Sequence, residues 1–407
     1  MTEQAVRPRQ SRTLHAADLV EVACRIVERD GLAGLTLRPL AEMLGVSVSV
    51  LTNRYGARDG VVAAICAAAR ERDAQLLGEW HATLVRTGPL SPGIAVELSE
   101  AILDDLATRG RALSLLFLEL MHASGCDDAL RAAFAPWADA RRALWVPLAA
   151  QALPAALRDW WHGYMLAELA YGVALNTLPS YRMLRRLCLR RLFAGGTAPS
   201  AAPEDMRLFG PVVERLQAGD DERIAAHRTD DAVAARVSRA CGIRLAAQGV
   251  NALTHRAVAH DVGIPHTTLS YRFPTQHDLV LAGLEHIVAH VLAAVDADSL
   301  ADTERLRTQD DGRRLDLARA SLAVTIAAVR MPALLPHAAR MRSRRGSNLA
   351  KVFRKYLPDT AGIDALCVQV VSLGLTGLAN AEPPGEAADG AVAAAFAASA
   401  RWLGKAA

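Results

Sequence analysis

The sequence has few aromatic residues and few of the β-branched residues that favour strands. Aromatic side chains account for 5% of its 407 residues, whereas hydrophobic residues together account for 52%, with alanine and leucine abundant. Because alanine and leucine favour helices, this composition predicts helix nearly throughout. A chain of this length also exceeds one small domain and suits two or more. We therefore expect an all-α protein built from two comparable halves.

The sequence also lacks the patterns that mark metal sites, disulfide frameworks and membrane spans. Its cysteines lie far apart, with no Cys-x-x-Cys pair, at Cys24, Cys66, Cys126, Cys188, Cys241 and Cys367. This spacing argues against zinc and disulfides and favours buried free thiols. The first residues have no apolar signal core, and no run of about 18 or more apolar residues occurs. We expect a cytoplasmic protein without metal, cofactor or membrane contact.

No arrangement of catalytic residues is present. The sequence has no Gly-x-Ser-x-Gly, no glycine loop that would cradle a phosphate and no paired carboxylates in a catalytic context. We therefore do not expect an enzyme. The formal net charge of +3 is small for this length. Any affinity for nucleic acid must then come from the placement of particular arginines.

One stretch of sequence occurs twice. Residues 31–64 match residues 249–282 without a gap, and several pairs are identical. These pairs are Gly31 and Gly249, Leu35 and Leu253, Thr36 and Thr254, Arg38 and Arg256, Ala41 and Ala259, Gly45 and Gly263, Leu51 and Leu269, Arg54 and Arg272, Val62 and Val280, and Ala64 and Ala282. Because the matches coincide with one local pattern, they indicate an internal duplication.

Each copy has the local pattern of a helix-turn-helix. In the first copy, apolar residues at helical spacing in 19–27 predict a helix that ends at Gly31. Thr36 is expected to cap a second helix that closes in a tight turn at Gly45, and Ser47 to cap a third. The corresponding residues of the second copy are Thr254, Gly263 and, opening the third helix, Pro265.

These residues resemble the amino-terminal domain of the TetR family of regulators. Both copies keep the family's order of a capping threonine, an apolar residue followed by alanine, and a turn glycine. The resemblance is specific over about residues 13–66 and 231–284. The copies depart from the family pattern at its tyrosine (Thr52 and Ser270), its small glycine (Ser49 and Thr267) and its lysine (Arg58 and Gln276).

The resemblance implies which side chains contact DNA, because the family places its third helix in the major groove. The readers would be Val48, Ser49, Thr52 and Asn53 in the first copy, and His266, Thr267, Ser270 and Tyr271 in the second. These sets differ chemically, which favours an asymmetric operator. The other candidate contacts are Arg38, Ser47, Arg54, Tyr55, Arg58, Arg256 and Arg272. For Arg54 and Arg272 the alternative is a salt bridge within the domain. Arg7, Arg9 and Arg12 form either a minor-groove arm or a solvated tail.

The resemblance also implies two tandem units, each a helix-turn-helix domain followed by a helical ligand and dimerisation domain. The expected domains are 1–66, 67–195, a linker at 196–230, 231–284 and 285–407. The linker follows from the composition of residues 195–203. Because the family pairs its last helices between subunits, residues 157–178 and 181–193 would pack on 363–379 and 387–403. A pseudo-dimer within one chain follows, and a homodimer with four heads is the alternative.

A pocket for a small apolar or aromatic ligand is a further implication. Aromatic residues concentrate in the first half, which favours sensing by the first half and scaffolding by the second. The candidate ligand-binding residues are Trp80, Phe117, Met121, His122, Trp137, Trp161 and Tyr164. The alternative is that these side chains are ordinary core.

Together these features predict a sequence-specific DNA-binding regulator. By the family default it would be a repressor of double-stranded DNA operators that a small molecule releases. The alternative is a ligand-binding or protein-interaction module whose DNA-binding heads have degenerated, which the missing tyrosine in both copies favours. The retained cations Arg54, Arg58 and Arg272 argue against that alternative.

Overall fold

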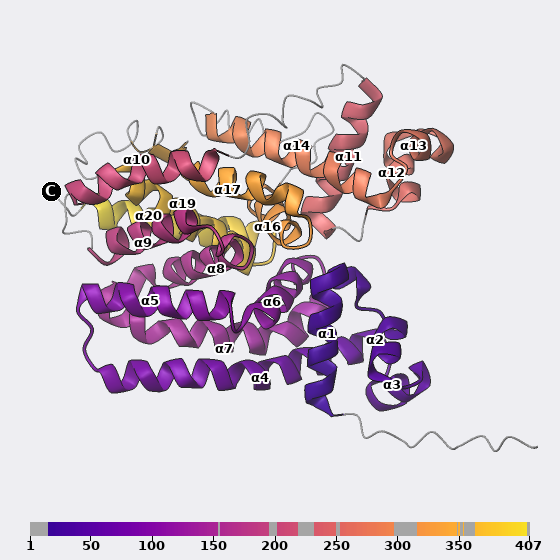
Figure 1. Ribbon diagram of the computed structural model, residues 1–407, viewed down its shortest axis with the longest axis horizontal. Coiled ribbons are helices and arrows are strands. Elements are labelled where there is room, and N and C mark those ends of the chain that lie inside the picture. Colours follow the sequence, from indigo (N-terminus) through magenta and orange to yellow (C-terminus); the bar gives the residue numbers. More distant parts are fainter. Residues whose placement is uncertain are drawn as a thin grey trace, which may run out of the picture.

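The computed structural model in Figure 1 confirms the all-α expectation. It describes residues 15–153, 155–194, 202–218, 232–249, 253–296, 316–347, 349–350, 353 and 363–404. Within these ranges every regular element is a helix, and there is no strand. None of the helices described there combines the length and the apolar character needed to span a bilayer.

The first half opens with three helices that form a compact unit, which we call the first head. Buried apolar residues of α1 pack this unit on the long helix that follows it. The three helices of the head are α1 (Ala16–Asp30), α2 (Leu37–Leu44) and α3 (Val48–Tyr55), and the long helix that follows is α4 (Arg58–Thr87). Beyond them come α5 (Pro92–Ala107), α6 (Arg111–Ser124), α7 (Asp128–Ala152), α8 (Arg158–Leu175) and α9 (Pro179–Phe193).

The second half begins, like the first, with one helix, two short helices and a long helix. Its first three helices, which we call the second head, are α11 (Ala232–Gln248), α12 (His255–Val262) and α13 (His266–Arg272). The described helices that follow are α14 (Gln276–Asp296), α16 (Leu317–Ala328), α17 (Leu335–Ser343), α19 (Ala365–Ala381) and α20 (Glu386–Gly404). Both heads lie at the same end of the molecule, at the right of Figure 1.

Helix α8 of the first half and α19 of the second form the most extensive contact between helices. Glycine makes this closeness possible, because a Cβ atom on Gly377 would overlap the carbonyl oxygen of Gly163, and one on Gly374 would overlap the indole of Trp160. The same indole donates a hydrogen bond to the carbonyl of Val371 at 3.3 Å. The expected packing of residues 157–178 on 363–379 is therefore present.

A buried ion pair crosses the same interface. Arg342 of α17 and Glu168 of α8 are both fully buried, and their charged atoms lie 2.6 Å apart. The Glu168 carboxylate also accepts hydrogen bonds from Tyr164 and Tyr181, at 3.2 and 3.1 Å. Arg342 donates to Gln369 at 2.6 Å. A buried pair with these additional partners fixes how the halves fit together, because breaking it would leave a charge without solvent.

Two expectations from the sequence need correction. The region 196–230 is not a linker throughout, because Pro203–Gln217 form helix α10. This helix packs on α9 and α17, and Gln217 donates to Ser343 at 3.1 Å. Elsewhere in the expected linker, residues 196–201 and 219–230 lie outside the described residues. The cysteines are free thiols as expected, but Cys126 is exposed and the others are buried.

Replacing Gly377 by alanine tests the packing of α8 on α19. The added methyl group overlaps the Gly163 carbonyl oxygen, so the helices must move apart. Overpacking of this kind costs roughly 1–3 kcal/mol, and we expect the free energy of unfolding in urea to fall by that amount. Gly390→Ala in α20 is the control, because nothing lies within 4 Å of its added Cβ. A Gly377→Ala protein as stable as the control would contradict the interpretation.

Candidate functional site

The turn between the second and third helices has the same backbone geometry in both heads. Gly45 has φ 70° and ψ 28°, and Gly263 has φ 67° and ψ 39°. Both lie in the left-handed region that glycine adopts without strain. The next amide in each head closes the turn, from Val46 to Ala41 at 3.0 Å and from Ile264 to Ala259 at 3.1 Å. The duplicated sequence therefore folds into a duplicated local structure.

Only some of the side chains that the sequence predicts as helix caps form capping hydrogen bonds. The hydroxyl of Thr254 accepts a hydrogen bond from the Ala257 amide at 3.2 Å and so caps α12. Thr36 and Ser47 occupy the capping positions of α2 and α3, but neither side chain accepts a hydrogen bond from a backbone amide of its helix. The Ser47 hydroxyl instead lies 2.7 Å from that of Ser49. Pro265 is itself the N-cap residue of α13 rather than its first helical residue.

In the first head, α3 is held by one buried side chain and presents most of the others to solvent. Leu51 is the buried residue, while Thr52 is half-buried and donates to the carbonyls of Val48 and Ser49, both at 3.2 Å. The Thr52 hydroxyl is thus already bonded within its own helix. The exposed candidates of this head are Arg38, Ser47, Val48, Ser49, Asn53, Arg54 and Arg58.

Arg54 does not form the salt bridge that was its alternative role. Its guanidinium lies 5.4 Å from the ring centroid of the half-buried Tyr55, a cation–π contact. In the described part of the chain no acidic side chain pairs with it. The Tyr55 ring packs on the core of the head, so it supports the arginine at the surface.

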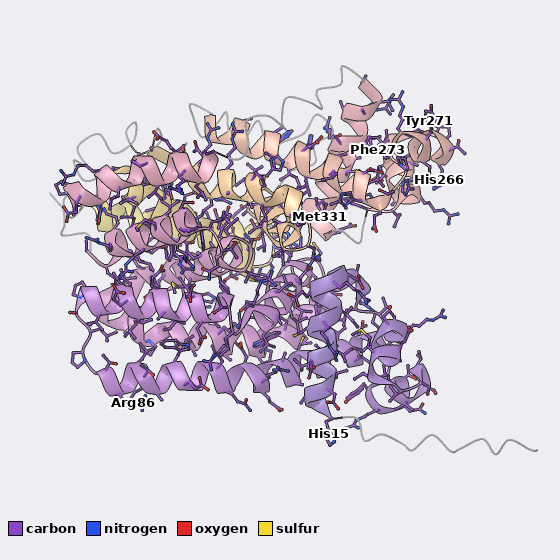
Figure 2. All side chains as sticks on the ribbon, in the orientation of Figure 1. His15, Arg86, His266, Tyr271, Phe273 and Met331 are labelled. Carbon is purple, nitrogen blue, oxygen red and sulfur yellow. The ribbon has the colours of Figure 1, made fainter. Side chains whose placement is uncertain are left out.

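In the second head, α13 is anchored by Leu269 and presents a different exposed set. Tyr271 is 88% exposed and, with His266, stands at the outer edge of the molecule in Figure 2. Ser270 is half-buried, and its hydroxyl lies 3.4 Å from Nδ1 of His266. The other exposed candidates are Arg256, Thr267 and Arg272. The arm residues Arg7, Arg9 and Arg12 lie outside the described residues.

Helix α16 contacts the first helix of the second head, and the residues just after α16 contact the first helix of the first head. Near its beginning, Arg319 donates to the carbonyl of Ala247 at the end of α11, at 3.4 Å, and to the carbonyl of His122 on α6 at 2.5 Å. Just past its end, Arg330 donates to the carbonyl of Val27 near the end of α1 at 3.2 Å. Helix α16 and the residues that follow it are therefore bonded to both heads.

His122 lies at the contact between α6 and the second head. It is buried near Gly249 and Arg319, and burial, with the arginine charge as a second cause, lowers its pKa to about 3. The ring is therefore neutral near pH 7. This position is part of the connection between the two halves, and His122 does not line a described cavity.

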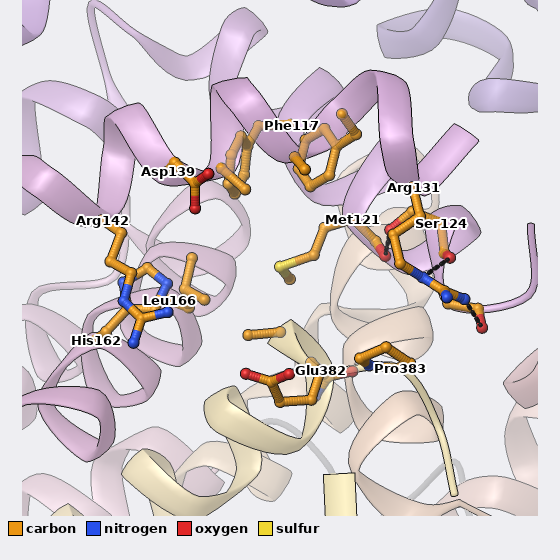
Figure 3. Close-up of a pocket in the computed structure, with 16 residues that line it drawn as sticks. Phe117, Met121, Ser124, Arg131, Asp139, Arg142, His162, Leu166, Glu382 and Pro383 are labelled. Atoms are coloured by element: carbon orange, nitrogen blue, oxygen red, sulfur yellow. Dashed lines mark hydrogen bonds between the residues drawn. The ribbon is translucent and has the colours of Figure 1, made fainter. Parts of the chain in front are cut away.

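A cavity of about 250 Å³ opens between the two halves, as Figure 3 shows. Of the expected ligand-binding residues, Phe117 and Met121 line it. The tryptophan side chains have other roles: the indole N–H groups of Trp80 and Trp137 donate to Asp105 and Asp73, both at 2.8 Å. Trp161 stacks on Tyr164, and Tyr164 is bonded to Glu168 as described above.

The polar residues of the cavity were not found by sequence reasoning. They come from α6, α7 and α8 and from the end of α19 in the second half, and they are Ser124, Arg131, Asp139, Arg142, His162, Asn380 and Glu382. Because part of the wall belongs to the second half, the expected division into a sensing half and a scaffolding half does not describe this cavity. The one sequence feature that marks this part of the wall is the helix break at Glu382–Pro383 between α19 and α20.

Comparison of the chain with protein-family models and with curated protein sequences found no match. The function proposed below therefore rests on the residues of this chain and their arrangement.

The pH dependence of stability tests the buried histidines. Burial lowers the pKa of His122 and His286 to about 3 and of His162 to about 4, from 6.5. Below pH 6.5 these three histidines therefore bind protons in the unfolded chain but stay unprotonated in the folded chain. Stability falls as the pH drops from about 6.5 toward these values, by up to about 1.4 kcal/mol per histidine per pH unit.

In urea titrations the free energy of unfolding should decrease between pH 7 and pH 5. We expect this decrease to be smaller for His122→Gln than for the parent. His260→Gln is the control, because the side chain of His260 is 89% exposed. A pH dependence equal to the parent's in the His122 variant would show that this ring does not resist protonation.

Proposed function

We propose that this protein is a sequence-specific DNA-binding regulator related to the TetR family, with two helix-turn-helix heads on one chain. The main support is the repetition of one local structure, in which a left-handed glycine joins two short helices and the second helix is exposed. Gly45 and Gly263 form these turns. Helices α3 and α13 lie at the same end of the molecule, which suits contact with one DNA duplex.

We further propose that the two halves act as a pseudo-dimer. Symmetric regulators place two reading helices on one duplex by pairing two identical subunits. Here the packing of α8 on α19 joins two halves that each supply one head. The chain would therefore hold its two heads in a fixed relation without a second copy.

The two heads would read different half-sites. Helix α3 exposes small apolar and polar side chains such as Val48 and Asn53, whereas α13 exposes His266 and Tyr271. Apolar side chains suit thymine methyl groups, and hydrogen-bonding side chains suit other base edges. An asymmetric operator follows, with Arg54 and Arg272 as cations in the last turn of the two reading helices.

The cavity would receive a small effector that lowers DNA affinity. Its wall includes Ser124 and Gly125 at the end of α6, and a Cβ on Gly125 would overlap the guanidinium of Arg319. Arg319 is bonded to Ala247 in the second head. Movement of Ser124 and Gly125 would therefore displace Arg319 and, through it, the second head. In this proposal the ligand favours a head spacing that no longer fits the operator, which is the behaviour of a released repressor.

The experiment that tests the proposal is selection of binding sites from a random duplex library at one salt concentration. The parent is compared with Arg54→Ala, Arg272→Ala and the control Arg86→Ala. Arg86 is exposed near the end of α4, far from both heads in Figure 2. We expect two unlike half-sites, with each head variant weakening one of them by about 1–3 kcal/mol and the control weakening neither.

Native mass spectrometry of the same complex distinguishes the pseudo-dimer from a homodimer with four heads. One chain bound to one duplex supports the pseudo-dimer. Failure of the parent to enrich any sequence would contradict DNA binding and would favour a ligand-binding or interaction module with degenerate heads.

A further inference from the structure

Two carboxylates and two arginines line the cavity between the halves. Asp139 of α7 and Glu382 at the end of α19 both line it, and Figure 3 shows their carboxylates on opposite sides of the space. Neither carboxylate has an ion-pair or hydrogen-bond partner within the described ranges. Two unpaired carboxylates facing one space repel each other, and a cation placed between them relieves that repulsion.

The arginines that also line the cavity are already engaged. Arg142 pairs with Asp159, and Arg131 pairs with Asp128 at 2.8 Å. Arg131 also donates to the carbonyl oxygens of Ser124 and Gly125, at 3.1 and 3.2 Å. These cations therefore have neutralising partners outside the cavity and do not balance its two carboxylates.

His162 supplies an independent sign of a missing ligand. It lines the cavity, is only 7% exposed, and its Nδ1 atom is buried with no hydrogen-bond partner among the residues that the structure describes. Burial lowers its pKa to about 4, so the ring is neutral near pH 7. A buried ring nitrogen without a partner loses the hydrogen bond it would make in water, and a ligand N–H group restores that bond.

The remaining wall is aromatic and apolar. Phe117 and Phe134 lie with ring centroids 4.9 Å apart, and Met121 and Leu166 complete the apolar lining. Aromatic faces attract organic cations, and the thioether of methionine adapts its shape to them. The volume of about 250 Å³ lies just below the usual range for drug-sized ligands, so the occupant must be compact.

We propose that this cavity binds a compact organic cation, an amine carried on an aromatic or apolar body. The ammonium group lies between Asp139 and Glu382, His162 accepts one of its hydrogens, and the apolar body packs on Phe117 and Met121. This assignment names the effector class of the proposed regulator and rests on that proposal for its effect on DNA. Anionic ligands are disfavoured, because the two carboxylates repel them.

The test uses three probes of similar shape in calorimetric titrations of the full chain without DNA. Phenethylamine carries the cation, 2-phenylethanol is its neutral counterpart, and 3-phenylpropionate is the anion. The variants are Asp139→Asn, Glu382→Gln and the double variant. Glu71→Gln is the matched control, because Glu71 is exposed on α4 and does not line the cavity.

We expect the parent and the control to bind the amine about tenfold more tightly than the alcohol, and the anion most weakly. Each single variant should weaken amine binding about twofold to fivefold, and the double variant about tenfold, while binding of the alcohol stays unchanged. The unchanged alcohol affinity shows that the variants remain folded.

Equal affinity for the amine and the alcohol, no amine binding at millimolar concentration, or variants that bind the amine like the control would each overturn the assignment. Because no DNA is present, these outcomes are separate from those of the binding-site selection. If the protein binds the amine but selects no operator, the cation site is supported and the proposed role as a DNA-binding regulator is contradicted.

Discussion

The close packing of α8 on α19 is the contact on which the rest of the structure depends. At the crossing, Gly163 meets Gly377 and Gly374 meets Trp160, so backbone approaches backbone with no room for a side chain. Such contact gains dispersion energy over the whole interface, but any added methyl group must separate the helices. The buried pair of Arg342 and Glu168 also fixes the relative position of the halves, because separating them would leave both charges buried without a partner.

This interface also creates both candidate functional features. It joins the halves so that the two heads lie at one end of the molecule, and it brings the end of α19 against α6, α7 and α8 to enclose the cavity. Arg319 and Arg330 then connect the same region to α11 and α1. The cavity and both heads therefore adjoin the same contact between the halves.

The heads were largely predictable because their structure depends on neighbours in sequence. A glycine nine residues beyond the helix cap and a leucine six residues after that glycine specify a turn and an anchored third helix, and both copies contain them. Helix α10 was also predictable in principle. Met206, Phe209 and Val213 follow helical spacing and pack on the core, but the small residues that precede them in 195–203 suggested a linker. Sequence reasoning overestimated the tryptophans as ligand contacts, because a buried indole packs and bonds equally well within the core, as Trp137 does with Asp73.

The sequence by itself determined the helical class, the duplication and the local form of each head, since composition, periodicity and turn glycines act within a few residues of one another. Only the tertiary structure decided which charges lack partners and which side chains share a cavity. Glu382 faces Asp139 because α8 and α19 pack together, although the two residues lie far apart in the chain. Neutralisation and burial depend on distance in space, and no local pattern encodes the distance between residues in opposite halves.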